Sequence, residues 1–171
     1  MNIHSYFDWA ATAPADEEIL RRCLNTSLEY TGNPSSVHKA GIEAKNLICD
    51  ARTRCGTILG VSPDTLYFTS GGTEGDYLPI LSLLQRPSPG SIVISAIEHP
   101  AIREQAEMMK NCGWKVYGVQ PNQEGIITPE AVIEKLDEDT ALVCVMAVNN
   151  ETGAIQPIYE IADALIQYAG N

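Results

Sequence analysis

The sequence lacks several features that mark whole classes of protein. No apolar run approaches the roughly 20 residues of a membrane-spanning helix, and the N-terminus lacks the basic flank and apolar stretch of a secretory signal. Basic residues are few, because 11 Lys and Arg stand against 22 Asp and Glu, a formal net charge of −11. This charge has the wrong sign for binding nucleic-acid phosphates or an anionic membrane surface. We therefore expect no nucleic acid and no membrane among its partners.

The cysteines also lack a pattern that would carry disulfides or a metal. There are five, an odd number, and they are scattered through the chain without a C-x-x-C pair. A secreted disulfide framework has an even number of cysteines at higher density. We expect a reduced, cytoplasmic protein without a metal site, in which most of these thiols are small core residues.

What remains is the composition of a folded α/β protein. The 171 residues are 44% apolar, enough for a real core. From residue 60 onward, short β-branched runs alternate with helical patterns, which is typical of βαβ units and a largely parallel sheet. The predicted strands are 65–69, 91–95, 115–119 and 141–148. The last is apolar without alternation, so we expect it at the centre of the sheet.

The predicted helices begin and end at clear capping residues. Asp16 is expected to cap a helix that stops at Gly32. Ser36 is expected to open a longer helix that ends at Gly60. Further helices are predicted over 72–85, from Pro100 to near Gly113, after Thr128 and after Pro157. Pro79 lies inside the first of these and removes a backbone hydrogen bond, so we expect a kink there.

The sharpest motif is Phe-Thr-Ser-Gly-Gly-Thr-Glu-Gly, residues 68–75. A predicted strand leads in and a predicted helix leads out, so backbone N–H groups at the helix start form an anion site and Thr73 adds a hydroxyl. The motif matches neither the dinucleotide nor the Walker pattern. By itself it leaves a phosphate site and an ordinary glycine-rich turn as equal alternatives.

Two further segments follow predicted strands and are expected to face the same crevice. Ser-Ala-Ile-Glu-His-Pro (95–100) places His99 where an imidazole can stack on a flat ligand or move a proton, or simply start a helix. Val-Asn-Asn-Glu-Thr-Gly (148–153) places two amides beyond a strand. Asn149 and Asn150 either bind a ligand or cap the turn into the next helix.

Taken in order, five segments resemble the cysteine desulfurase family, pyridoxal-phosphate enzymes of the class V aminotransferase group. They are 6–14 (YFDWAATAP), 32–38 (GNPSSVH), 68–74 (FTSGGTE), 95–100 (SAIEHP) and 148–153 (VNNETG), and Gln-Pro-Ile follows at 156–158. The resemblance implies an α/β fold, a three-layer sandwich with a mainly parallel sheet. This is the large domain of fold type I pyridoxal-phosphate transferases, incomplete at its C-terminus. Residues 1–15 would belong to the small-domain side and residues 16–171 to the N-terminal part of the large domain.

The resemblance also assigns roles to single residues and a cofactor, pyridoxal 5'-phosphate. The backbone of Gly72 and the side chain of Thr73 would hold the cofactor phosphate. His99 would stack on the pyridine ring and take part in proton transfer. Asn150 would lie near the ring hydroxyl and the substrate, and Asn33 in the loop that meets the substrate carboxylate.

The activity implied is removal of sulfur from L-cysteine onto a mobile cysteine, which leaves alanine. The sulfur would pass to an acceptor or scaffold protein for iron–sulfur clusters or thiolated products, and the enzyme would be a homodimer. In the family, the Asp that pairs with the pyridine nitrogen, the Schiff-base lysine and the sulfur-carrying cysteine all lie beyond the position of Asn171. We expect this chain alone to be inactive. The alternative is a non-catalytic binding or interaction module that pairs with itself or with a complementary half.

The chain departs from the family pattern in two places. Trp9 or Ala10 stands where the family usually has a polar residue, often Asn. Asp76 stands where the phosphate turn usually has Asn, and its carboxylate lies one turn from the expected phosphate site. We expect this like charge to weaken anion binding.

Overall fold

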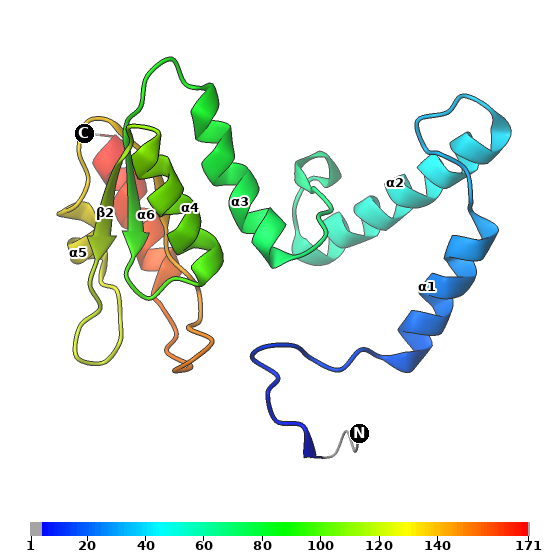
Figure 1. The fold of residues 1–171 in the computed structure, drawn as a ribbon, viewed down its shortest axis with the longest axis horizontal. Coiled ribbons are helices and arrows are strands. Elements are labelled where there is room, and N and C mark those ends of the chain that lie inside the picture. Colours follow the sequence, from blue (N-terminus) through cyan, green and yellow to red (C-terminus); the bar gives the residue numbers. More distant parts are fainter. Residues whose placement is uncertain (1–4, 171) are drawn as a thin grey trace. The chain divides into compact units, whose positions relative to one another are not determined.

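The chain folds into two compact units. The computed structural model of the protein describes residues 5–170, with one unit ending at Phe68 and the other beginning at Thr69 (Figure 1). The division after residue 15 that the resemblance implies stays a prediction.

The first unit is built from two helices. They are α1 (Glu17–Glu29) and α2 (Lys39–Leu59), followed by the short 3-10 helix η2 (Pro63–Thr65). Asp16 caps α1 as predicted, because its Oδ1 accepts the Ile19 N–H at 3.0 Å. Gly60 ends α2 as predicted, in the left-handed conformation with φ of 69°.

The start of α2 differs from the prediction. The N-cap is His38, whose Nδ1 accepts the N–H of Gly41 at 3.3 Å, and not Ser36. The backbone N–H of Ser36 donates to the carbonyl of Asn33 at 2.9 Å, so this residue closes a turn before the helix begins. Because Ser36 belongs to this turn, the helix begins only after it, at Lys39.

The strand predicted over 65–69 is wrong. Leu66 has an extended backbone, with φ of −98° and ψ of 128°, but no strand within residues 5–170 pairs with it. A strand needs a hydrogen-bonded neighbour, and the β-branched pattern supplies only the extended conformation. The carbonyl of Leu66 instead accepts a side-chain bond of 3.2 Å from Arg52 Nε.

The second unit contains a parallel three-stranded sheet with helices along the chain between its strands (Figure 1). The strands are β1 (Ser91–Ser95), β2 (Lys115–Val119) and β3 (Thr140–Cys144), in the order β2-β1-β3. The helices are α3 (Gly72–Ser82), its 3-10 extension η3 (Leu83–Gln85), α4 (Pro100–Asn111), α5 (Pro129–Ile133) and α6 (Ile158–Ala169). Pro100, Thr128 and Pro157 begin or cap their helices as predicted. The kink at Pro79, inside α3, stays a prediction.

Helices cover both faces of this sheet. Successive residues of a strand point to opposite faces, and the two central residues of β1, Ile92 and Val93, are both fully buried. Ile92 belongs to a core cluster with Ile80 of α3 and residues of α4, whereas Val93 belongs to a second cluster with residues of α5 and α6. The expected three-layer α/β sandwich is therefore confirmed.

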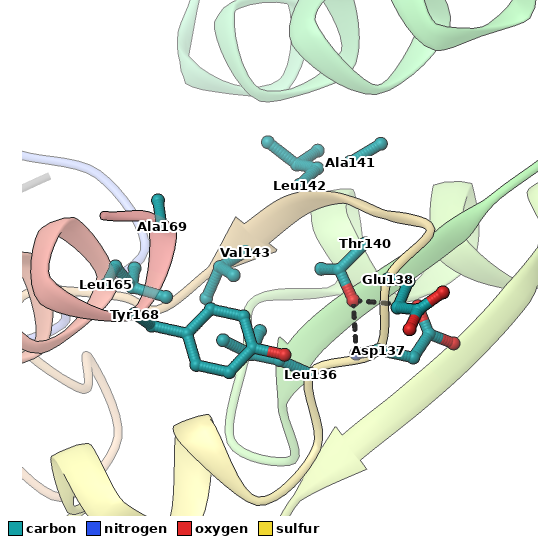
Figure 2. A pocket seen from close by; sticks show the side chains of 10 residues that line it. All are labelled: Leu136, Asp137, Glu138, Thr140, Ala141, Leu142, Val143, Leu165, Tyr168 and Ala169. Atoms are coloured by element: carbon teal, nitrogen blue, oxygen red, sulfur yellow. Dashed lines mark hydrogen bonds between the residues drawn. The ribbon is translucent and has the colours of Figure 1, made fainter. Parts of the chain in front are cut away.

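The place of β3 in the sheet differs from the prediction. The central strand is β1, and β3 ends at Cys144 with all its residues half-buried. No strand among residues 5–170 pairs with its far side. An open groove of about 420 Å³ runs along this edge, with Tyr168 of α6 beside Val143 of β3 (Figure 2). The apolar composition predicts a buried strand, but burial also needs a neighbour on that side.

Within residues 5–170, no helix combines the length and the apolar character needed to cross a membrane.

Candidate functional site

Three segments of the second unit meet at one edge of the sheet. Because β1 and β3 are parallel, their carboxyl ends lie at the same edge, and the loops after Ser95 and Cys144 leave from there. Burial and the carboxylates of Glu98 and Asp76 raise the pKa of Cys144 to about 12. The start of α3 is placed near this edge because α3 packs against α4, the helix that begins there, and because Asp76 of α3 acts on Cys144.

The start of α3 has free hydrogen-bond donors and open space in front of them. Gly71 is the N-cap and supplies no capping side chain. The N–H of Gly75 bonds to the carbonyl of Gly71 at 3.1 Å, so the donors ahead of it in the first turn are those without a helical partner. A Cβ at Gly71 or Gly72 would meet no heavy atom within 4 Å. With the exposed hydroxyl of Thr73, these donors can receive a phosphate.

Two carboxylates stand close to these donors. Oε2 of Glu74 accepts the N–H and the hydroxyl of Ser70, both at 2.6 Å, and these bonds lower the pKa of Glu74. Asp76 is exposed one position after Gly75. The weakening of anion binding by Asp76 stays a prediction.

His99 has a local role and a free ring face. It is the N-cap of α4, and its Nδ1 accepts the N–H of Ala101 at 3.1 Å. In the neutral ring the proton is therefore assigned to Nε2, which becomes a donor. The helix-start interpretation of His99 is confirmed. It occupies only one nitrogen, and because the residue is exposed, the ring face and Nε2 are accessible to a ligand.

The two asparagines after β3 behave differently. Asn149 is buried, and its Oδ1 accepts the N–H groups of Glu151 at 3.0 Å and Thr152 at 2.8 Å. It is the turn-capping residue of the pair. Asn150 is exposed, and none of the hydrogen bonds found among residues 5–170 uses its side chain. Only Asn150 is free to meet a ligand.

Sequence reasoning missed Glu98, which joins the two loops at this edge. Its side chain is 7% exposed, and Oε1 accepts the hydroxyl of Ser95 and the N–H of Met146, both at 2.6 Å. The available signal was a carboxylate three residues after a serine at the end of a buried strand. That spacing brings the carboxylate back to the serine hydroxyl.

Asn33 belongs to the first unit. Its Oδ1 accepts the N–H of Ser35 at 2.9 Å, which holds the loop between α1 and α2 in an Asx turn. The structure thus brings the loops of Gly72, Thr73, His99 and Asn150 to one edge of the second unit. The position of Asn33 relative to them stays a prediction.

Comparison with known proteins defines the class to which this fold and this edge belong. The aminotransferase class-V family matches residues 5–170. The chain therefore belongs to this family.

The similar proteins are cysteine desulfurases and NifS-like proteins. The chain is 38% identical to the "NifS/IcsS protein homolog" of Lactobacillus delbrueckii subsp. bulgaricus, over 95% of this chain and 43% of that protein. It is 35% identical to "Cysteine desulfurase IscS 1" of Archaeoglobus fulgidus, over 94% of this chain and 42% of that protein. Among solved structures, a "NIFS-LIKE PROTEIN" matches with a TM-score of 0.85 and 34% identity, covering 92% of this chain and 44% of that one. "SspA in complex with cysteine" matches with a TM-score of 0.90 and 30% identity, covering 96% of this chain and 48% of that one.

The chain spans less than half the length of the relatives it matches. The similar region includes all five motifs and the whole parallel sheet described above. The resemblance to the cysteine desulfurase family and the expected fold class are confirmed.

Proposed function

We propose that this chain is the N-terminal, cofactor-holding part of a pyridoxal-phosphate-dependent cysteine desulfurase. The observation that carries the proposal is the meeting of three motif loops at one edge of the sheet, in a chain whose family match spans residues 5–170. Each loop contributes one kind of group: N–H donors from α3, an imidazole from α4 and a carboxamide from the turn after β3.

The residues present fit the phosphate of pyridoxal 5'-phosphate. The first turn of α3 has donors without helical partners, and a Cβ at Gly71 or Gly72 would have open space around it. We assign the phosphate to the N–H groups of Gly72 and Thr73 and to the hydroxyl of Thr73. The helix dipole favours a dianion at this position.

The other two side chains would hold and orient the ring. His99 keeps Nδ1 in the α4 cap, which fixes its ring plane and leaves Nε2 to carry or deliver a proton. Asn150 would donate from its free amide to the ring hydroxyl, and Asn33 would meet the substrate carboxylate. When bound, the cofactor supplies an electron sink for breaking the carbon–sulfur bond of L-cysteine.

Full turnover would require groups in the part of the relatives that this chain does not span. The lysines within residues 5–170 that form ion pairs are well exposed: Lys39, Lys110 and Lys115. None lies in the loops of Gly72, His99 or Asn150. We propose that the complete protein is a cytoplasmic homodimer that transfers the sulfur to an acceptor or scaffold protein.

A second function, that of an interaction module, is favoured by the open edge of β3. A strand edge with an apolar groove beside it presents unpaired backbone groups (Figure 2). Such an edge would pair with a second copy or with a complementary polypeptide. Ligand binding separates the two functions, because a module of this kind would pair through the β3 edge without binding pyridoxine 5'-phosphate, whereas the N-terminal part of a desulfurase would bind it.

The test of the first proposal is a calorimetric titration with pyridoxine 5'-phosphate, which lacks the aldehyde and forms no adduct with surface lysines. We expect saturable binding, and binding of phosphate-free pyridoxine at least about tenfold weaker, because the helix N-terminus holds the phosphate. Thr73→Val should weaken only the phosphorylated ligand, whereas Thr57→Val on α2 should change neither. Equal affinity for both ligands would contradict the phosphate assignment. With pyridoxal phosphate and L-cysteine, we expect no sulfide or alanine from this chain alone, and real turnover would overturn its inactivity.

A further inference from the structure

Beyond the ends of the paired strands, two side chains continue the connection between the loops of His99 and Asn150. The β1–β3 pairing ends at Ile94 and Cys144. After this point the N–H of Met146 donates to Glu98 Oε1 at 2.6 Å. The Nδ2 of Asn149 donates to the carbonyl of Ile97 at 3.1 Å. The first hydrogen bond uses a side chain of the loop after β1, and the second uses a side chain of the loop after β3.

Each connection lies one residue from a proposed ligand-binding residue. Glu98 directly precedes His99, and Asn149 directly precedes Asn150. Both connecting side chains are 7% exposed, whereas both neighbours are exposed. The buried member of each pair is therefore anchored, and the exposed member faces outward from a fixed backbone.

The carboxylate of Glu98 is itself held in place. Ser95, which is fully buried, donates its hydroxyl to the same Oε1 at 2.6 Å. A buried carboxylate is costly to leave without its hydrogen-bond donors, so the bond from Met146 to Glu98 resists separation of the two loops.

We propose that Glu98 is a positioning residue that holds the loops of His99 and Asn150 at the spacing a ring ligand requires. This inference rests on the proposed function, because it concerns how the same edge receives the cofactor. Glu98 does not touch the ligand. It acts through the backbone of Met146 on one side and of His99 on the other.

The test compares Glu98→Ala with Glu98→Gln, and uses Glu104→Gln on the exposed side of α4 as the control. Glu98→Ala should weaken pyridoxine 5'-phosphate binding about tenfold, because both donors lose their acceptor. Glu98→Gln keeps a carbonyl oxygen at this position and should retain affinity to within about threefold. The control should bind as the unaltered chain does.

A second readout separates positioning from simple support of the fold. In Glu98→Ala, the amide proton of Met146 should lose the downfield shift of a carboxylate-bound N–H. Hydrogen exchange should rise together at 97–99 and 146–150 while Val93 in the core stays protected. Ser95→Ala, which removes one donor and leaves Glu98 in place, is the milder variant if Glu98→Ala does not fold. It should show the same loop signature with a smaller amplitude.

Two results would overturn the positioning role. One is unchanged affinity together with unchanged resonances of His99 and Asn150 in Glu98→Ala. The other is a uniform rise of exchange across the whole second unit, because that marks a structural role alone. If the unaltered chain does not bind pyridoxine 5'-phosphate, the proposed function fails, and the Met146 and loop-exchange signatures alone decide for or against the positioning by Glu98.

Discussion

The two units of the chain contain helices with similar amphipathic patterns but bury them to very different degrees. In the first unit, α1 has no buried residue, and Ile19, Leu24 and Leu28 on its apolar side are more than half exposed. An open groove of about 820 Å³ lies between α1 and α2. In the second unit, Ile92 and Met109 are fully buried between strand and helix.

An amphipathic pattern is enough to form a helix, but a buried core also needs a second apolar surface for the helix to pack against. In the second unit the sheet offers a flat apolar face on each side, so α3 to α6 find a surface to cover. The first unit has no sheet within residues 5–68, and its helices keep apolar residues at the surface. The relatives are more than twice as long as this chain. We expect the apolar face of α1 to be covered by a polypeptide segment that corresponds to the rest of the relatives, or by a second copy of the chain.

The largest expected contrast comes from one residue type changed in both units. Ile92→Ala opens a cavity at a fully buried site and should lower the free energy of unfolding of the second unit by about 2–5 kcal/mol. Ile19→Ala, at a side chain that is 58% exposed, should change stability by less than about 0.5 kcal/mol. Hydrogen exchange resolved by residue measures the stability of each unit separately. Equal losses would break the comparison between the units.

A buried amide sharpens the same comparison with a polar group. Gln156 is 3% exposed, and its Oε1 accepts the Ile127 N–H at 2.8 Å. Gln156→Leu leaves that N–H without an acceptor and should cost about 1–3 kcal/mol. Ser27→Ala removes an exposed bond on α1 and should cost well below 1 kcal/mol by the usual behaviour of surface sites. The midpoints of urea unfolding measure both losses. A midpoint for Gln156→Leu equal to that of the unaltered chain would contradict the hydrogen bond between Ile127 and Gln156.

Acid should affect the second unit through Asp137. The hydroxyl of Ser91, together with Thr140 and Tyr117, holds the pKa of Asp137 below its usual value near 4. A lowered folded-state pKa gives stability that is present above the unfolded value and is lost as the pH falls through the folded one. We expect this loss below about pH 4. In a plot of the free energy of unfolding against pH, Asp137→Asn should make the fall below about pH 4 less steep. Asp50→Asn, which alters an exposed ion pair on α2, should leave that fall unchanged.

The smallest effect concerns thiol reactivity. Burial and the nearby carboxylates raise the pKa of Cys144 to about 12, so it stays a neutral thiol at pH 8. Cys23, Cys49 and Cys112 are exposed, so the expectation that most of the thiols are core residues is wrong, and these three should react with a thiol reagent first. Mass mapping after partial labelling gives the order. Labelling of Cys144 as fast as the exposed cysteines would show that the end of β3 is open to solvent.

Sequence reasoning succeeded where the determining interactions are local. The cap at Asp16, the left-handed Gly60 and the helix starts at Pro100 and Thr128 each depend on residues within one turn. The two strands β1 and β2 match the predicted ranges because their β-branched patterns are flanked by turn residues.

The failures share a different cause, which is dependence on distant partners. Residues 65–69 have an extended pattern but no neighbour to pair with, and β3 lacks a strand on its far side. For the site, the loops after β1 and β3 leave the same edge of the sheet as predicted, and the roles of their residues stay predictions. Glu98 was missed because its role appears only once Met146, 48 positions away along the chain, is known to donate to it.

Gly72, Thr73, His99 and Asn150 are proposed to serve one ligand together. Residue-resolved NMR of the isotope-labelled chain during titration with pyridoxine 5'-phosphate tests this directly. We expect the resonances of the Gly72 and Thr73 backbone amides, the His99 ring and the Asn150 side-chain amide to shift together along one saturation curve. Shifts at the start of α3 without any at His99 and Asn150, or shifts that fit separate curves, would contradict this proposal.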